Sequence, residues 1–159
     1  MIHTSHDLPE STRSQMIDVL NQQLADTFDL YSQVKQAHWN VKGPNFQQLH
    51  ELFDEVAIGV LPFVDEIAER ATALGGSAHG TARMAAATSR LEEMSADAID
   101  GPDAVRAVAR TLAGAASTTR AAIDAAGDAG DEGTADLFTG ISRELDKLLW
   151  FVEAHAQTA

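Results

Sequence analysis

Apolar residues recur every three or four positions along most of the chain, which is the spacing of amphipathic α-helices. The first such segment opens with a capping-box sequence, Asp7 to Glu10, and continues to the helix-breaking pair Gly43-Pro44. The second is capped by Asn45 and runs to Leu74, where two glycines end it. The pattern therefore predicts two long helices that are joined by a short turn and pack antiparallel.

The connection that follows, residues 75–101, is long and contains only a short alanine-rich segment near 81–88. Gly101-Pro102 starts a third helix, and an acidic turn from Gly127 to Gly133 separates it from a fourth, which runs through Val152. Two antiparallel hairpins linked by one long crossover make an all-α, four-helix bundle of ferritin-like topology.

Composition fits one domain over residues 1–159, with residues 1–7 as a short N-terminal tail. The absence of cysteine excludes disulfides and thiolate metal sites. The sequence also lacks a run of about eighteen apolar residues, which a membrane-spanning helix would need. We therefore expect a cytoplasmic protein without a membrane partner. The formal net charge is −13, and an acidic surface attracts cations. The eleven lysines and arginines are scattered along the chain, whereas binding to the DNA backbone needs clustered positive charge.

The second predicted helix carries four side chains of metal-ligand type in a symmetric arrangement. His50 and Glu69 are equidistant from a point between residues 59 and 60, and so are Asp54 and Asp65. At ~1.5 Å rise per residue the two halves lie ~16 Å apart, too far to share one ion. An antiparallel copy of the helix, related by a two-fold axis at that point, would bring the histidine half of one chain against the acidic half of the other. The sequence therefore predicts two metal sites per dimer, each shared between subunits.

The same stripe of this helix includes Ile58 and Leu61, which we expect to pack across the two-fold axis. Pro62 is expected to kink the helix near that axis. A second stripe lies on roughly the opposite side and is expected to face the subunit's own core: Phe46, Leu49, Phe53, Val56, Val60, Phe63 and Ile67.

His38 joins the set through the hairpin turn, because positions 38 and 50 are equidistant from Pro44. Two imidazoles and three carboxylates with open coordination positions favour non-haem iron, with zinc as a competitor. No glutamate is followed three residues later by histidine, the pattern that di-iron bundles use within one subunit, and this again favours an interface site. Taken singly, each of the five residues is more simply a solvated or capping side chain; their shared spacing favours a metal site.

The same residues lie in motifs that resemble one protein family. The motifs are His38-Trp39-Asn40-Val41-Lys42-Gly43, Leu49-His50, Phe53-Asp54, Asp65-Glu66-Ile67-Ala68-Glu69-Arg70 and Gly133-Thr134-Ala135-Asp136-Leu137. They are similar to the DNA-protection-during-starvation (Dps) family of mini-ferritins, over nearly the whole chain. The resemblance implies a hollow homododecamer built from two-fold dimers. In that family, residues matching His38, His50 and Asp54 come from one subunit and those matching Asp65 and Glu69 from its partner.

The resemblance further implies an iron-storing enzyme, a ferroxidase, that protects against oxidative damage. It would oxidise Fe(II), preferably with hydrogen peroxide, and keep the ferric product as mineral inside the shell. Asp65 and Glu69 would hold the tightest iron ion by charge, and Asp54 with a histidine would bind a second, weaker one. Two electrons leaving two iron ions together reduce peroxide to water without releasing hydroxyl radical.

Two further assignments follow from the resemblance. Trp39 matches a family tryptophan near the iron pair and would trap stray oxidising equivalents; a packing role at the helix end is the alternative. Carboxylates near the last turn match a three-fold pore that admits Fe(II), with a solvated, N-capped turn as the alternative: Asp124, Asp128, Asp131 and Asp136. Trp150, on the last helix, is expected in the core.

The chain ends differ from those of DNA-binding family members, which commonly carry extensions rich in Lys and Arg. Residues 1–12 contain neither, and residues 153–159 are acidic to neutral. Direct DNA binding is therefore strongly disfavoured. Two alternatives to the ferroxidase remain: a nucleoid-compacting DNA-binding protein with secondary ferroxidase activity, and a shell that binds zinc or iron without turnover.

Overall fold

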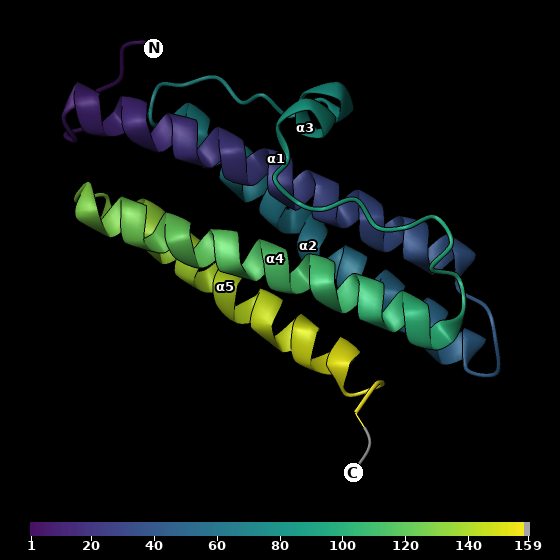
Figure 1. The fold of residues 1–159 in the computed structure, drawn as a ribbon. Helices are drawn as coiled ribbons and strands as arrows, with labels where there is room; N and C mark the ends of the chain where they lie inside the picture. The colour runs from purple at the N-terminus through teal and green to yellow at the C-terminus, as the bar shows by residue number, and fades with distance from the viewer. Residues whose placement is uncertain (158–159) are drawn as a thin grey trace.

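Residues 1–157, which the computed structural model describes, form four long helices and a short one (Figure 1). They are α1 (Glu10–Asn40), α2 (Phe46–Ala73), α3 (Ala82–Thr88), α4 (Gly101–Asp128) and α5 (Glu132–Glu153). The first two long helices make one antiparallel hairpin, the last two make another, and the hairpins lie side by side (Figure 1). The predicted all-α, ferritin-like bundle is confirmed. None of the described helices is long and apolar enough to cross a membrane.

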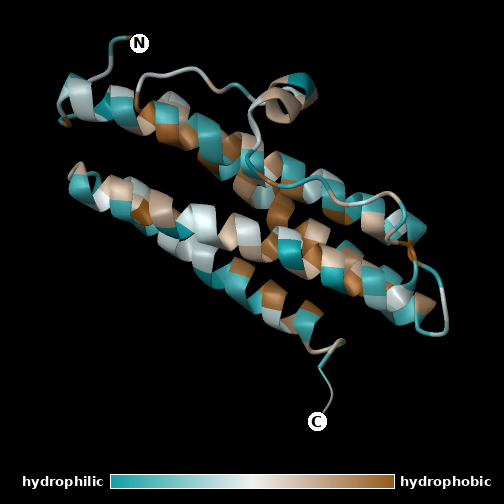
Figure 2. Cartoon of the chain, in the orientation of Figure 1, coloured by the Kyte–Doolittle hydropathy of each residue, from teal (hydrophilic) through white to brown (hydrophobic). Residues whose placement is uncertain are grey.

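The core lies between the two hairpins, where the apolar stripes of the long helices meet. Figure 2 shows hydrophobic segments alternating with hydrophilic ones along each helix, as amphipathic packing requires. Phe53 of α2 and Phe138 of α5 are its largest fully buried side chains. Five members of the stripe predicted to face the core are buried: Leu49, Phe53, Val56, Val60 and Ile67. Phe63 is only partly buried and Phe46, at the first turn of α2, is exposed, so the prediction was wrong for Phe46.

Two of the predicted helix caps are absent. Helix α1 begins at Glu10 with Pro9 at its N-cap position and no side-chain cap, so the capping box at Asp7 was wrong. Asp7 lies too early, because the first helical hydrogen bond already runs from the Arg13 N–H to the Pro9 carbonyl. Asn45 precedes α2 but its side chain makes no capping hydrogen bond either.

The turn between α4 and α5 is shorter than predicted. Helix α4 continues through Asp128, and α5 starts at Glu132, so only three residues connect them. The alanine-rich end of α4 keeps Gly127 helical, whereas Gly130 takes a positive φ of 76° and makes the turn. Asp131 then caps α5 by accepting a hydrogen bond from the Thr134 N–H.

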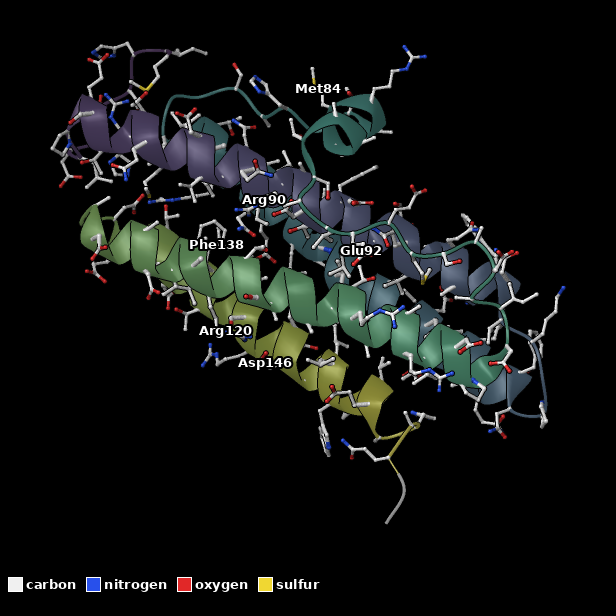
Figure 3. The ribbon with its side chains drawn as sticks, in the orientation of Figure 1. Met84, Arg90, Glu92, Arg120, Phe138 and Asp146 are labelled. Carbon is white, nitrogen blue, oxygen red and sulfur yellow. The ribbon has the colours of Figure 1, made fainter. Side chains whose placement is uncertain are left out.

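The crossover between α2 and α4 is fastened along α1. The buried carboxylate of Asp26 accepts hydrogen bonds from the Arg90 backbone N–H (2.8 Å) and guanidinium (2.6 Å), and Figure 3 shows Arg90 beside α1. Farther on, the Lys42 N–H donates to the Ile99 carbonyl at 2.7 Å. The crossover therefore runs along the bundle and starts α4 at the end where α1 stops, so α4 runs antiparallel to α1 and the turns of the two hairpins lie at opposite ends of the bundle (Figure 1).

Candidate metal centre

His38 and His50 face each other across the α1–α2 hairpin. His38 lies in the last turn of α1 and His50 in the second turn of α2, and their rings stack with centroids 3.9 Å apart and planes 21° from parallel. The prediction that the short turn places the two imidazoles at the same height is confirmed. Phe46 covers one side of the pair, with its ring centroid 5.1 Å from that of His50.

Each histidine is oriented by the backbone of the other. The Nδ1 atom of His38 lies 2.7 Å from the His50 carbonyl oxygen, and Nδ1 of His50 lies 2.9 Å from the His38 carbonyl oxygen. A carbonyl oxygen only accepts, so Nδ1 must carry the proton and donate in both rings. In the neutral form of each ring the lone pair then lies on Nε2, which is the arrangement an imidazole needs to bind a metal ion.

Asp54 lies one helical turn beyond His50 and has a partner that was not predicted. The Lys35 ammonium group, on α1, donates to its carboxylate at 2.6 Å. The hydrogen bond and charge of Lys35, together with the nearby His38 and His50, hold the pKa of the Asp54 carboxyl below its usual value, although desolvation acts in the opposite direction. Asp54 is thus an ionised carboxylate, and one of its oxygens already accepts a hydrogen bond from an ammonium group.

The acidic pair lies at the other end of α2. Asp65 and Glu69 are one turn apart and exposed. Between them and the histidine end, Ile58 and Leu61 are 63% and 45% exposed, an unusual degree for large apolar side chains in the middle of a long helix. The single chain therefore presents an outward stripe with a histidine half at one end, an apolar centre and an acidic half at the other.

Within residues 1–157 of one chain, no three His, Asp or Glu side chains come together in a way that could hold a metal ion. Of the five predicted ligands, the fold brings His38 and His50 into contact and places Asp54 near them. Asp65 and Glu69 stay apart from those three along the length of α2. Within one chain the predicted ligands therefore form two separate groups.

Both tryptophans are exposed on the surface of the chain. Trp39 follows His38 at the end of α1 and is exposed, with the Lys35 ammonium group 5.8 Å from its ring centroid. Trp150 is 62% exposed and packs beside Phe151, so its predicted place in the core was wrong. The stripe of α5 that faces the core passes through Leu148 and Val152 instead, which leaves position 150 on the opposite side of the helix.

The acidic residues at the α4–α5 turn separate into two groups. Asp124, Asp128 and Asp136 line one hollow of about 690 Å³, together with Glu132, which the sequence analysis missed. Asp131 does not line it: its side chain is 2% exposed and its carboxylate is occupied by Arg70 and Thr134. Its place among the pore candidates was therefore wrong, because it serves as the N-cap of α5.

Lys35 and Arg70 are the site neighbours that sequence reasoning overlooked. Lys35 precedes His38 by three positions and Trp39 by four, which is helical spacing that places all three on one side of α1. Arg70 follows Glu69 directly, and its contact with Asp131 joins segments 61 positions apart, which no local spacing reveals.

Comparison with known proteins agrees with this architecture. The family model described as ferritin-like domain matches residues 17–159. The DNA protection during starvation protein of Agrobacterium fabrum is 43% identical over 154 residues, 97% of this chain and 95% of that protein. The protein of the same name from Brevibacillus brevis is 35% identical over 140 residues, 86% of this chain and 91% of that protein.

Solved structures agree as well. The Mycobacterium smegmatis Dps structure matches with a TM-score of 0.94 at 32% identity, covering 100% of this chain and 90% of that one. The Dps structure from Vibrio cholerae, described as a member of a broad superfamily of ferritin-like diiron-carboxylate proteins, matches with a TM-score of 0.90 at 27% identity and covers 99% and 98%. The chain therefore belongs to the Dps family of mini-ferritins, iron-binding proteins of storage and protection.

Proposed function

We propose that this chain is a ferroxidase that assembles as a homododecamer and stores the ferric product within its shell. The observation that carries this proposal is the division of one stripe of α2 into a half-buried histidine half and an exposed acidic half, placed symmetrically about a point between residues 59 and 60. Two antiparallel copies of this stripe would form two equal centres. Ile58 and Leu61 would supply the apolar contact between them.

The residues have distinct roles in such a centre. Asp65 and Glu69 of one subunit would bind Fe(II) through hard carboxylate oxygens, and one histidine of the other subunit would complete the sphere through Nε2. Asp54, once released from Lys35, would bind the second Fe(II) together with the remaining histidine. Nδ1–H donation to backbone carbonyls fixes both rings before iron arrives, which lowers the reorganisation that binding requires. Peroxide is the oxidant we expect, since it accepts the two electrons that an iron pair releases.

The acidic hollow at the α4–α5 turn would serve as the uptake route. Asp124, Asp128, Glu132 and Asp136 surround it, and a concentration of carboxylates around a hollow raises the local concentration of divalent cations. In a shell with three-fold axes, three such hollows would converge on one pore.

Anaerobic loading with Fe(II), followed by hydrogen peroxide, tests the reaction. We expect rapid ferric formation that consumes about two Fe(II) per peroxide, the stoichiometry of a two-metal centre. Asp65→Ala should abolish this fast phase while size-exclusion chromatography shows the assembly intact. Binding of iron without fast oxidation would indicate a metal-binding shell, and unchanged kinetics in Asp65→Ala would remove the acidic half from the mechanism.

Replacing Lys35 with methionine should strengthen binding of the second metal ion. The substitution removes the ammonium group that occupies the Asp54 carboxylate and leaves a side chain of similar length. We expect the weaker of two Co²⁺ dissociation constants to fall by up to about fivefold, because a partly exposed ion pair contributes little. Isothermal titration measures both constants, and the tighter one should stay unchanged. Weaker binding in Lys35→Met would mean that Lys35 supports the site rather than competes for it.

Bare DNA should not bind this protein. A dodecamer multiplies the −13 formal charge of each chain twelvefold, and the positive charge that releases counterions from DNA is scattered. We expect no retardation of plasmid DNA in an agarose gel at ~50 mM salt, where electrostatic binding is strong. A shifted band would favour the nucleoid-compacting alternative.

A further inference from the structure

We propose that Arg70, Asp131 and Thr134 form a clamp that positions the acidic half of the metal centre. The inference rests on the proposed function and adds positioning residues to it. The clamp joins the last turns of α2, which carry Asp65 and Glu69, to the start of α5.

The clamp is a closed network of hydrogen bonds. The Arg70 guanidinium donates from Nη2 to Asp131 Oδ1 at 2.7 Å and from Nε to Thr134 Oγ1 at 3.0 Å. Thr134 in turn donates its N–H to Asp131 Oδ1 at 3.0 Å and its hydroxyl to Oδ2 at 2.5 Å. Each of the three residues therefore takes part in at least two of the four hydrogen bonds, which fixes direction as well as distance.

Burial makes this network stronger than an ordinary surface ion pair. The side chain of Asp131 is 2% exposed, and that of Arg70 is 23% exposed. Burial acts to raise the pKa of the Asp131 carboxyl, but the hydrogen bonds from Thr134 and the charge of Arg70 outweigh it and keep the pKa below its usual value. The carboxylate therefore stays charged at neutral pH. Gly133 gives the guanidinium room, since a Cβ there would lie 3.0 Å from Arg70 Nη2.

The location of the clamp explains what it positions. Glu69 directly precedes Arg70, and α2 ends at Ala73, so Glu69 lies where helices fray. A guanidinium held at two points prevents α2 from rotating about its axis at this end, and the direction of the adjacent Glu69 is set by that rotation. The histidine end of α2 is fastened to α1 by its own reciprocal hydrogen bonds. Both halves must be fixed, because each centre would combine opposite ends of two copies of α2.

Titration of the assembled protein with Co²⁺, followed by its visible absorption, tests the clamp. We expect Arg70→Met to weaken the tight site about 10–100-fold, the usual loss when a residue that orients a metal ligand is removed. Its spectrum should also change, because a misdirected Glu69 alters the coordination number. Arg70→Lys keeps the charge but not the two-point contact, and should restore part of the affinity.

The matched control is the ion pair between Arg120 and Asp146. It joins α4 to α5 at 2.9 Å without touching α2, both side chains are exposed, and Figure 3 shows them near each other. Asp146→Asn should leave the Co²⁺ affinity and spectrum unchanged. Chromatography and thermal unfolding of every variant separate loss of the site from loss of the assembly.

The possible results of these titrations distinguish failure of the clamp from failure of the proposed function. Wild-type Co²⁺ affinity and spectrum in an assembled Arg70→Met would overturn the clamp while leaving the ferroxidase proposal intact. Should Arg70→Met fail to assemble, Thr134→Val breaks the same network from α5, and normal binding in that variant would overturn the clamp equally. Absence of an Asp65-dependent Co²⁺ site in the wild-type protein would instead refute the proposed function.

Discussion

Co-expression of two inactive variants should restore ferroxidase activity to about a quarter of the wild-type level, because the proposed centres are shared between subunits. One variant carries His50→Ala and Asp54→Ala, and the other carries Asp65→Ala and Glu69→Ala. Each alone makes dimers in which both centres lack one half. In a mixed dimer, one centre receives both damaged halves and the other receives both intact halves. Random pairing makes about half of the dimers mixed, and each of these has one working centre of two.

Stopped-flow oxidation of Fe(II) by peroxide measures this recovery. Different affinity tags on the two variants allow mixed assemblies to be purified, and mass spectrometry gives their composition. Mixing the separately assembled variants without subunit exchange provides the control and should remain inactive. Complete centres within single chains would leave the co-expressed mixture as inactive as its components, and that result would refute the shared arrangement.

Replacing Phe53 with alanine should destabilise the protein by about 3–5 kcal/mol, the cost of emptying a fully buried aromatic site. Phe53 is 0% exposed and lies directly before Asp54, so the cavity would open in the core beneath the histidine half. The midpoint of urea unfolding, followed by helical circular dichroism, gives the size of the effect at a fixed protein concentration.

Met84→Ala is the matched control for this loss. Met84 is a large apolar side chain on α3 that is exposed, and its truncation should change the urea midpoint little. A Phe53→Ala protein as stable as Met84→Ala would mean that the core around α2 collapses to fill the cavity.

The helices were predictable because their signals are local. The three-to-four-residue spacing of apolar positions, together with helix breakers such as Gly43-Pro44 and Gly101-Pro102, places the long helices. Two short turns and one long crossover between these helices then indicate the ferritin-like topology. The missing caps at Asp7 and Asn45 show the limit of this reasoning. A capping residue is recognised by type and offset, but the backbone decides within one residue where a helix starts.

The part of the candidate site that depends on helical spacing and on the short α1–α2 turn was predictable. These two rules place His38 against His50, and they assign Asp54, Asp65 and Glu69 to one stripe. The partner of Asp131 was not predictable, since Arg70 reaches it across the bundle. Trp150 was misplaced because a bulky aromatic residue suggests burial by type, whereas its position on α5 faces outward.

The distribution of the proposed ligands along α2 has a consequence for a newly synthesised chain. If neither half binds iron tightly alone, a lone protomer starts no iron chemistry, and oxidation becomes possible only when a second protomer docks on its outward stripe. Catalysis would then depend on the square of protomer concentration at high dilution. Such a requirement delays the reaction with peroxide until a shell is forming around the product.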